Sequence, residues 1–130
     1  MPDPRELAAI FAGGCVGALA RAGLVEAFPV GRGHWPWVTL LVNLAGTLAL
    51  GFFVTRLQER LPPSAYRRPL LGTGFCGALT TFSTMQVEIL RMLDGGHVAL
   101  ALTYALTSVV AGFLAVALAT NLVRHTRVFA

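Results

Sequence analysis

Four long runs of apolar residues divide this chain, and none of them shows the polar alternation of a soluble amphipathic helix or strand. The runs span about 7–28, 38–54, 70–90 and 98–123. A helix needs roughly 20 predominantly apolar residues to cross a hydrocarbon core of ~30 Å. The pattern therefore predicts an all-α integral membrane protein with four transmembrane helices, which form a single domain over residues 1–130.

The first two runs carry different signals at their ends. Trp35 and Trp37 precede the second run, at the depth where aromatic rings favour the membrane interface. A cleaved signal peptide is the competing interpretation of the first run, because Ala-Leu-Ala at 18–20 resembles a cleavage site. Asp3 and Glu6 stand where a signal peptide carries positive charge, so we expect the first run to remain as a transmembrane helix.

Composition and charge agree with a multi-pass membrane protein. Hydrophobic residues make up 55% of the chain and charged residues 12%, about half the charged share of an ordinary soluble domain. With four spans, the side that holds both termini has seven of the ten arginines, and three lie on the other side. The seven are Arg5, Arg56, Arg60, Arg67, Arg68, Arg124 and Arg127, and the three are Arg32, Arg91 and Arg21. The positive-inside rule predicts that both termini lie in the cytoplasm. We expect the protein to lie in the cell membrane.

The distribution of basic residues, cysteines, serines and threonines argues against several classes of function. A nucleic-acid-binding surface needs basic charge clustered on a folded soluble face, which this chain does not offer. Cys15 and Cys76 lie inside apolar runs without metal-ligand spacing, which predicts two buried, reduced thiols. The serines and threonines have no adjacent histidine base. We therefore expect neither nucleic-acid binding nor enzymatic activity.

The third run is unusually rich in small and hydroxyl-bearing residues. Between Gly72 and Met85 it contains three glycines, four threonines and one serine. Glycine loosens the helix and hydroxyls can bond freed carbonyls, so a break in mid-membrane is tolerable where protein buries it. Unwound carbonyls in such helices hold cations, and helix N-termini face anions. The alternative is that the small residues only permit close packing, as the GxxxG spacing predicts for Gly13 and Gly17.

Three strings of residues match one known family. The string that begins at Gly74, GFCGALTTFST, resembles the signature of the Fluc (CrcB) fluoride channels, and Thr-Thr-Phe-Ser-Thr is its most specific part. The strings GGCVGALAR, which ends at Arg21, and VNLAG, which begins at Val42, match as well. The resemblance implies passive export of cytoplasmic fluoride by an antiparallel dimer in the lipid bilayer. Its subunits would be two copies of the chain, or two paralogous chains, in opposite orientations.

The resemblance also implies roles for individual residues. Backbone carbonyls of Gly77 and Thr80, at a break in the third helix, are implied to hold a structural Na⁺ at the two-fold axis. Candidate pore or anion-binding residues are Asn43, Thr81, Phe82, Ser83, Met85, Tyr104 and Ser108, joined by Arg21 and Glu88 as ionisable groups in or near the membrane. An asparagine amide can donate two hydrogen bonds, and an aromatic ring edge is electropositive, so both suit a small anion.

Two positions depart from the family pattern. Met85 stands where the family has a second phenylalanine. In the family a line of hydroxyls tends to continue beyond the positions of Tyr104 and Ser108, but here Gly112 and Val116 follow, and neither carries a hydroxyl.

The arginine asymmetry favours one orientation of this chain in the membrane, whereas the antiparallel dimer that the resemblance implies needs both orientations. We therefore predict an opposite-facing, non-identical partner that supplies the missing groups.

Two other functions fit a small four-helix membrane protein. A small multidrug-type, proton-coupled transporter needs a carboxylate at mid-membrane, but Glu6 and Glu26 lie toward the ends of the first run. An accessory subunit without a pore is the third hypothesis, which the interrupted hydroxyl line and Met85 favour. Fluoride leak without proton coupling, cation–proton exchange, or neither would separate the three hypotheses in liposomes.

Overall fold

The computed structural model describes residues 1, 3–31, 33–59 and 66–126, and within this part of the chain every regular element is a helix. Arg32, Arg60 and Arg127 lie outside the described residues. The elements in chain order are α1 (Pro4–Ala27), α2 (Trp37–Glu59), the π-helix η1 (Pro69–Cys76), α3 (Gly77–Leu79), α4 (Phe82–Asp94) and α5 (Val98–His125).

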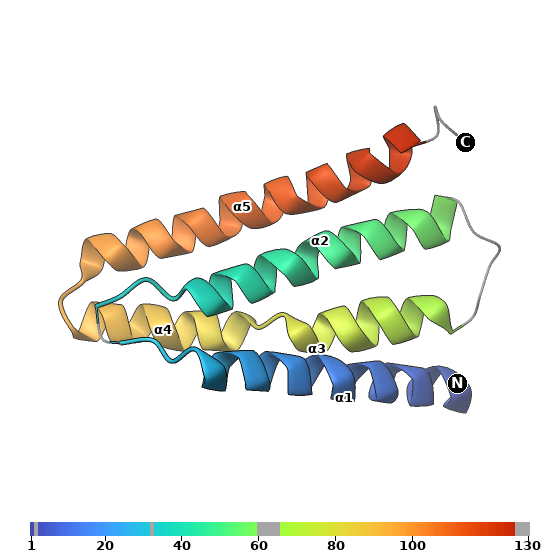
Figure 1. Ribbon diagram of the computed structural model, residues 1–130, viewed down its shortest axis with the longest axis horizontal. Helices are drawn as coiled ribbons and strands as arrows, with labels where there is room; N and C mark the ends of the chain where they lie inside the picture. Colours follow the sequence, from blue (N-terminus) through green and yellow to red (C-terminus); the bar gives the residue numbers. More distant parts are fainter. Residues whose placement is uncertain (2, 32, 60–65, 127–130) are drawn as a thin grey trace.

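Three of the helices are long and apolar enough to cross a membrane, namely Pro4–Ala27, Trp37–Leu57 and Val98–His125. They contain most of the first, second and fourth apolar runs, as a multi-pass membrane protein requires. The third run is divided among η1, α3 and α4. These three elements follow one another along a line between α2 and α1, and the beginning of α1 and the end of α5 lie at the same end of the molecule (Figure 1).

Glycines allow α1 and η1 to approach each other closely. A Cβ atom on Gly13 would collide with the carbonyl oxygen of Leu70, and one on Gly17 with the carbonyl oxygen of Phe75. A Cβ on Gly74 would lie 2.5 Å from the carbonyl oxygen of an α1 residue. The close packing that the sequence predicts for Gly13 and Gly17 is therefore confirmed, and Gly74 contributes to it from the opposite helix.

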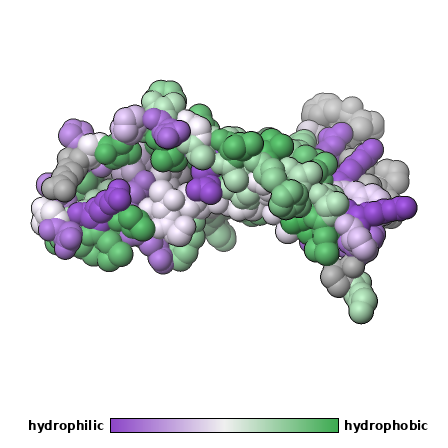
Figure 2. Space-filling model, turned by 90° about the horizontal axis from the view of Figure 1, so that it is seen from below, coloured by the Kyte–Doolittle hydropathy of each residue, from purple (hydrophilic) through white to green (hydrophobic). Residues whose placement is uncertain are grey.

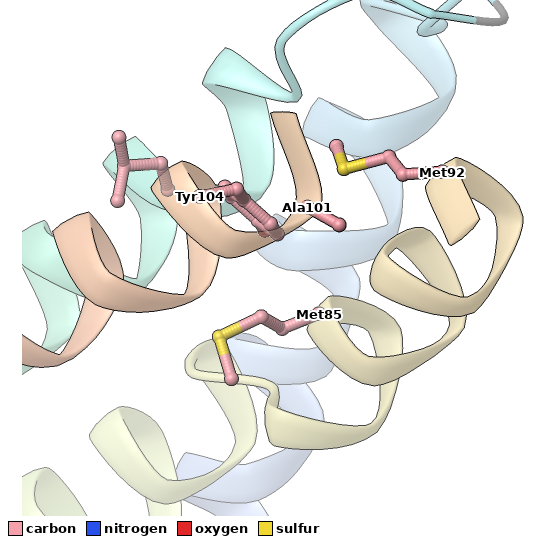
Figure 3. Packing of buried hydrophobic residues seen from close by; sticks show 5 residues of the cluster. Met85, Met92, Ala101 and Tyr104 are labelled. Atoms are coloured by element: carbon pink, nitrogen blue, oxygen red, sulfur yellow. The ribbon is translucent and has the colours of Figure 1, made fainter. Parts of the chain in front are cut away.

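A buried core lies where α4 and α5 meet the beginning of α2. It consists of Leu40, Met85, Met92, Ala101 and Tyr104. Figure 3 shows Met85 and Met92 on α4 and Ala101 and Tyr104 on α5. Tyr104 is completely buried, and the Trp35 ring packs edge-on against it with ring centroids 5.5 Å apart. This core fixes α4, and therefore the C-terminal part of the third apolar run, against α5.

Much of the apolar surface faces outward, as a bilayer allows. Figure 2 shows hydrophobic residues over the middle of one face and hydrophilic residues gathered toward the ends. Large exposed side chains include Phe11 and Phe113, each 74% exposed. Cys76 is buried as predicted, but Cys15 is exposed. The prediction for Cys15 is wrong because α1 packs through Gly13 and Gly17, and a residue two positions from each lies on the opposite face of a helix.

Candidate functional site at the break between α3 and α4

The backbone of the third apolar run is not helical at Thr80 and Thr81. Both residues are extended, with φ −76° and ψ 151° at Thr80 and φ −145° and ψ 115° at Thr81. In a continuous helix each carbonyl accepts a hydrogen bond from the N–H four residues later. The interruption therefore removes the regular helical donors of the four carbonyls from Gly77 to Thr80.

Thr81 also determines where α4 begins. Its hydroxyl accepts a hydrogen bond from the Thr84 N–H at 3.2 Å, which makes Thr81 the N-cap of α4. The same hydroxyl donates to Thr84 Oγ1 at 3.0 Å and lies 3.4 Å from Ser83 Oγ. Threonine is a favoured N-cap because its oxygen satisfies a donor that the helix leaves unpaired. The hydroxyl residues of the TTFST string thus close one end of the break.

Asn43, on α2, pairs with the main chain of the break. Its Oδ1 accepts from the Thr81 N–H at 2.7 Å, and its Nδ2 donates to the Thr81 carbonyl at 3.1 Å. Both groups are part-buried, where such bonds are stronger than in water. Two of the predicted pore residues, 38 positions apart in the chain, are therefore in direct contact.

Arg21 reaches the break from α1. Its Nε donates to the Ala78 carbonyl at 3.0 Å, so one of the four carbonyls without a regular helical donor is bonded to a cationic side chain. Charge counting groups Arg21 with Arg32 and Arg91 on the side opposite the termini. The structure instead places its half-buried guanidinium beside the break.

Glu88, on α4, accepts two hydroxyl hydrogen bonds. Thr39 Oγ1 donates to one carboxylate oxygen at 2.5 Å and Tyr104 Oη to the other at 2.7 Å. Thr39 is only 2% exposed and was not a candidate from the sequence, although Thr39, Asn43 and Thr47 recur at intervals of four on α2. Such spacing puts all three on one face of the helix, and this polar stripe is the signal that could have identified Thr39.

An open groove of about 320 Å³ runs past the break. It is lined by Leu40, Asn43, Leu44, Thr47, Leu50, Thr80, Thr81, Phe82, Met85, Ser108, Val109 and Gly112. Phe82 is 68% exposed, whereas Met85 is 9% exposed and belongs to the core. Ser108 Oγ is buried and has no hydrogen-bond partner among the described residues.

The groove brings together only part of the predicted site. Asn43, Thr80, Thr81, Phe82, Met85 and Ser108 line it, while Arg21, Gly77, Ser83, Glu88 and Tyr104 are not among its lining residues. Over the described ranges, no group of three or more His, Cys, Asp or Glu side chains could hold a metal ion. In interrupted membrane helices, main-chain oxygens that lack a helical donor can contact cations.

Comparison with known proteins identifies the family. Residues 8–120 match the profile of the family described as CrcB-like protein, Camphor Resistance (CrcB). The "Fluoride-specific ion channel FluC 1" of Mycolicibacterium paratuberculosis is 62% identical over 126 residues, which cover 97% of this chain and 96% of the relative. The FluC 1 protein of Mycobacterium bovis is 58% identical over 126 residues, with the same coverage of 97% and 96%.

A more distant relative shares most of the chain as well. The "Fluoride-specific ion channel FluC 2" of Nocardia farcinica is 38% identical over 122 residues, which cover 94% of this chain and 87% of the relative. The family profile and these relatives span the same helices that enclose the break and the groove. This chain belongs to the CrcB-like protein family.

Proposed function

We propose that this chain is a subunit of a fluoride-selective channel, through which cytoplasmic fluoride leaves the cell passively. The relatives support the proposal, because they are named fluoride-specific ion channels and are similar to this chain over nearly its whole length. The observation that carries it is the interruption at Thr80 and Thr81, which places main-chain and hydroxyl groups beside an open groove.

The groove offers groups that suit a small, strongly hydrated anion. Fluoride that leaves water needs hydrogen-bond donors to replace its hydration shell. Ser108 Oγ has no partner within the described residues and can turn its proton toward the groove. The N-terminus of α4 carries a partial positive charge, and the exposed Phe82 ring can present its electropositive edge. These groups form the core of the proposed fluoride path.

The shape of the groove calls for a second subunit. One chain forms only an open wall, and Phe82, at 68% exposure, projects from it without cover. An antiparallel dimer would close each groove with the opposite-facing subunit. The numbering in the names FluC 1 and FluC 2 indicates that related organisms carry more than one such protein. We therefore propose a paralogous, opposite-facing partner, which would also complete the hydroxyl line that Gly112 and Val116 interrupt.

The main chain at the break fits a structural sodium ion. The Thr81 N–H, the regular helical donor to the Gly77 carbonyl, bonds to Asn43, and the Thr84 N–H, the regular donor to the Thr80 carbonyl, bonds to Thr81 Oγ1. Carbonyls freed in this way coordinate Na⁺ in other interrupted membrane helices. We propose that Gly77 and Thr80 of both subunits would hold the ion, whose charge would offset the carbonyl dipoles at the dimer centre.

Fluoride efflux from liposomes tests the function. The purified chain is reconstituted in vesicles loaded with potassium fluoride, alone or together with a second family member from the same organism, and efflux is read with a fluoride electrode after addition of valinomycin. We expect efflux that needs no proton gradient and that reaches its full rate only with the paralogue. Full flux from the chain alone would contradict the non-identical partner while leaving the channel intact.

The same vesicles separate the competing functions. Exchange of an organic cation for protons would indicate a small multidrug-type transporter. The absence of any flux, from the chain alone or together with the second family member, would indicate an accessory subunit.

Ser108→Ala is the direct probe of the groove, because it removes a hydroxyl that has no partner among the described residues. We expect this variant to fold normally and to pass fluoride more slowly.

A further inference from the structure

Both polar atoms of the Asn43 side chain form hydrogen bonds with the main chain of one residue, Thr81. Its oxygen takes the N–H of Thr81 and its nitrogen takes the carbonyl of the same residue, at 2.7 Å and 3.1 Å. The same pair of bonds, one donated and one accepted, joins two residues that lie opposite each other in antiparallel β-strands. It matches the backbone of Thr81, which has the φ of −145° and ψ of 115° of a strand residue.

This pairing competes directly with the helix. The Thr81 N–H would bond to the Gly77 carbonyl if α3 continued, so its capture by Asn43 releases that carbonyl. The second release occurs at Thr80, because the Thr84 N–H that would bond its carbonyl is held by Thr81 Oγ1. The extended conformation of Thr81 thus frees both carbonyls that the sodium proposal requires, and Asn43 is the side chain from outside the crossing that holds Thr81 in this conformation.

α2 also contacts the break at Gly46, which packs against the side chain of Thr80. Gly46 lies almost one helical turn after Asn43, and a Cβ atom there would collide with Cγ2 of Thr80. The Thr80 side chain therefore occupies space that only a glycine leaves open. Asn43 and Gly46 together form a contact surface on α2, in which Asn43 binds the main chain of Thr81 and Gly46 leaves room for the side chain of Thr80.

We propose that Asn43 is a positioning residue of this channel, which acts through the main chain of Thr81 rather than by giving its amide to fluoride. Its role is to hold Thr81 extended, so that the Gly77 carbonyl remains outside the helical hydrogen-bond pattern and free to contact the central cation. This inference rests on the proposed sodium site and departs from the role that the family resemblance implies for Asn43.

Two substitutions separate positioning from anion donation. Asn43→Leu removes both bonds to Thr81 at similar size. Asn43→Asp keeps an acceptor for the Thr81 N–H but removes the donor amide. Ser108→Ala is the matched control, because it removes a polar group from the same groove without touching the break.

The readouts are amide hydrogen exchange of the segment 80–84 in the reconstituted dimer, and the shift in thermal unfolding between sodium chloride and N-methyl-D-glucamine chloride. We expect Asn43→Leu to speed exchange of this segment about tenfold or more and to abolish the sodium-dependent shift, because a buried hydrogen bond is lost. Asn43→Asp and Ser108→Ala should keep exchange within about threefold of the unchanged protein. If Asn43→Leu does not fold, Asn43→Asp decides through efflux: protection and fluoride efflux both retained would show that the donor amide does not serve the anion and would support the proposal, whereas efflux lost with protection retained would overturn it.

The opposite result is equally clear. Unchanged exchange and an unchanged sodium shift in Asn43→Leu, with fluoride efflux lost, would mean that Asn43 serves the anion directly, and the proposal would fail. Failure of the underlying function has a different signature. In that case the unchanged protein would show no sodium-dependent shift and no efflux, while the exchange data would still report whether Asn43 holds Thr81.

Discussion

Met85 and Phe82 lie within one helical turn on α4 and have opposite environments. Met85 is 9% exposed and packs in the core, whereas Phe82 is 68% exposed. An unbranched, flexible methionine can fill the space beside Tyr104 that a rigid ring would have to fit in one orientation. The departure from the family pattern at this position therefore has a structural account, in which Met85 supplies core volume at the edge of the groove.

Truncation of Met85 should cost stability. Met85→Ala leaves a cavity beside Tyr104, and we expect a loss of about 2–4 kcal/mol in the free energy of unfolding. Leu90→Ala is the control, because Leu90 is on the same helix and is 64% exposed. Denaturant titration in detergent, followed by circular dichroism, measures both variants. Equal losses for the two would show that Met85 is not a core residue.

At the scale of the elements, the apolar runs predict where helices lie but not how the third one is built. The run at 98–123 corresponds to α5, Val98–His125, because a long apolar run without proline can remain helical throughout. Pro69–Cys76 is a π-helix that packs closely against α1, and the pairing of Asn43 with Thr81 joins residues 38 positions apart. Local spacing predicts neither feature, and although the polar stripe on α2 marks Thr39, it does not identify Glu88, 49 positions away, as its partner.

The start of α4 depends on the hydroxyl of Thr81. Thr81→Val keeps the shape of the side chain but removes the acceptor for the Thr84 N–H, and we expect a loss of about 1–2 kcal/mol in unfolding free energy. Thr103→Val is the matched control, since the Thr103 hydroxyl bonds only to a carbonyl of its own helix and is exposed. Chemical unfolding compares the two. A loss no larger than that of the control would contradict the capping role.

The contact between α1 and η1 requires glycine at position 74. Gly74→Ala would push a methyl group into the carbonyl of Ile10, and we expect overpacking to cost about 1–3 kcal/mol. Gly23→Ala serves as the control, because a Cβ at Gly23 meets nothing within 4 Å and alanine is the better helix former. The control should be neutral or slightly stabilising in the same unfolding assay. Tolerance of alanine at position 74 would show that the two helices are less tightly packed than described.

At the scale of the whole molecule, the arginine bias of the sequence becomes a difference between two ends of the bundle. Arg91 lies in the last turn of α4, at one extremity of the bundle. The opposite extremity, where α1 begins and α5 ends, holds five arginines at or next to helix ends: Arg5, Arg56, Arg67, Arg68 and Arg124. A chain with such a bias is expected to insert in one orientation. An antiparallel pair then needs a partner with the opposite bias, which is why the orientation of this chain bears on its oligomeric state.

Reversal of charge at Arg67 and Arg68 tests this link. Both residues are exposed and directly precede η1. In a background of Cys15→Ser and Cys76→Ser, a single cysteine added at the N-terminus is labelled in intact cells with a membrane-impermeant maleimide. We expect labelling to rise from near zero to roughly half of the molecules in Arg67→Glu/Arg68→Glu, because this change weakens the charge bias that favours cytoplasmic termini.

Arg91→Glu is the matched control for this experiment, because it removes positive charge from the opposite end and strengthens the bias. Its N-terminal cysteine should stay unlabelled. Unchanged labelling in the double variant would show that loop charge does not set the orientation. If the double variant inserts both ways and then passes fluoride without a paralogue, the single orientation of the natural chain is what makes a second, opposite-facing protein necessary.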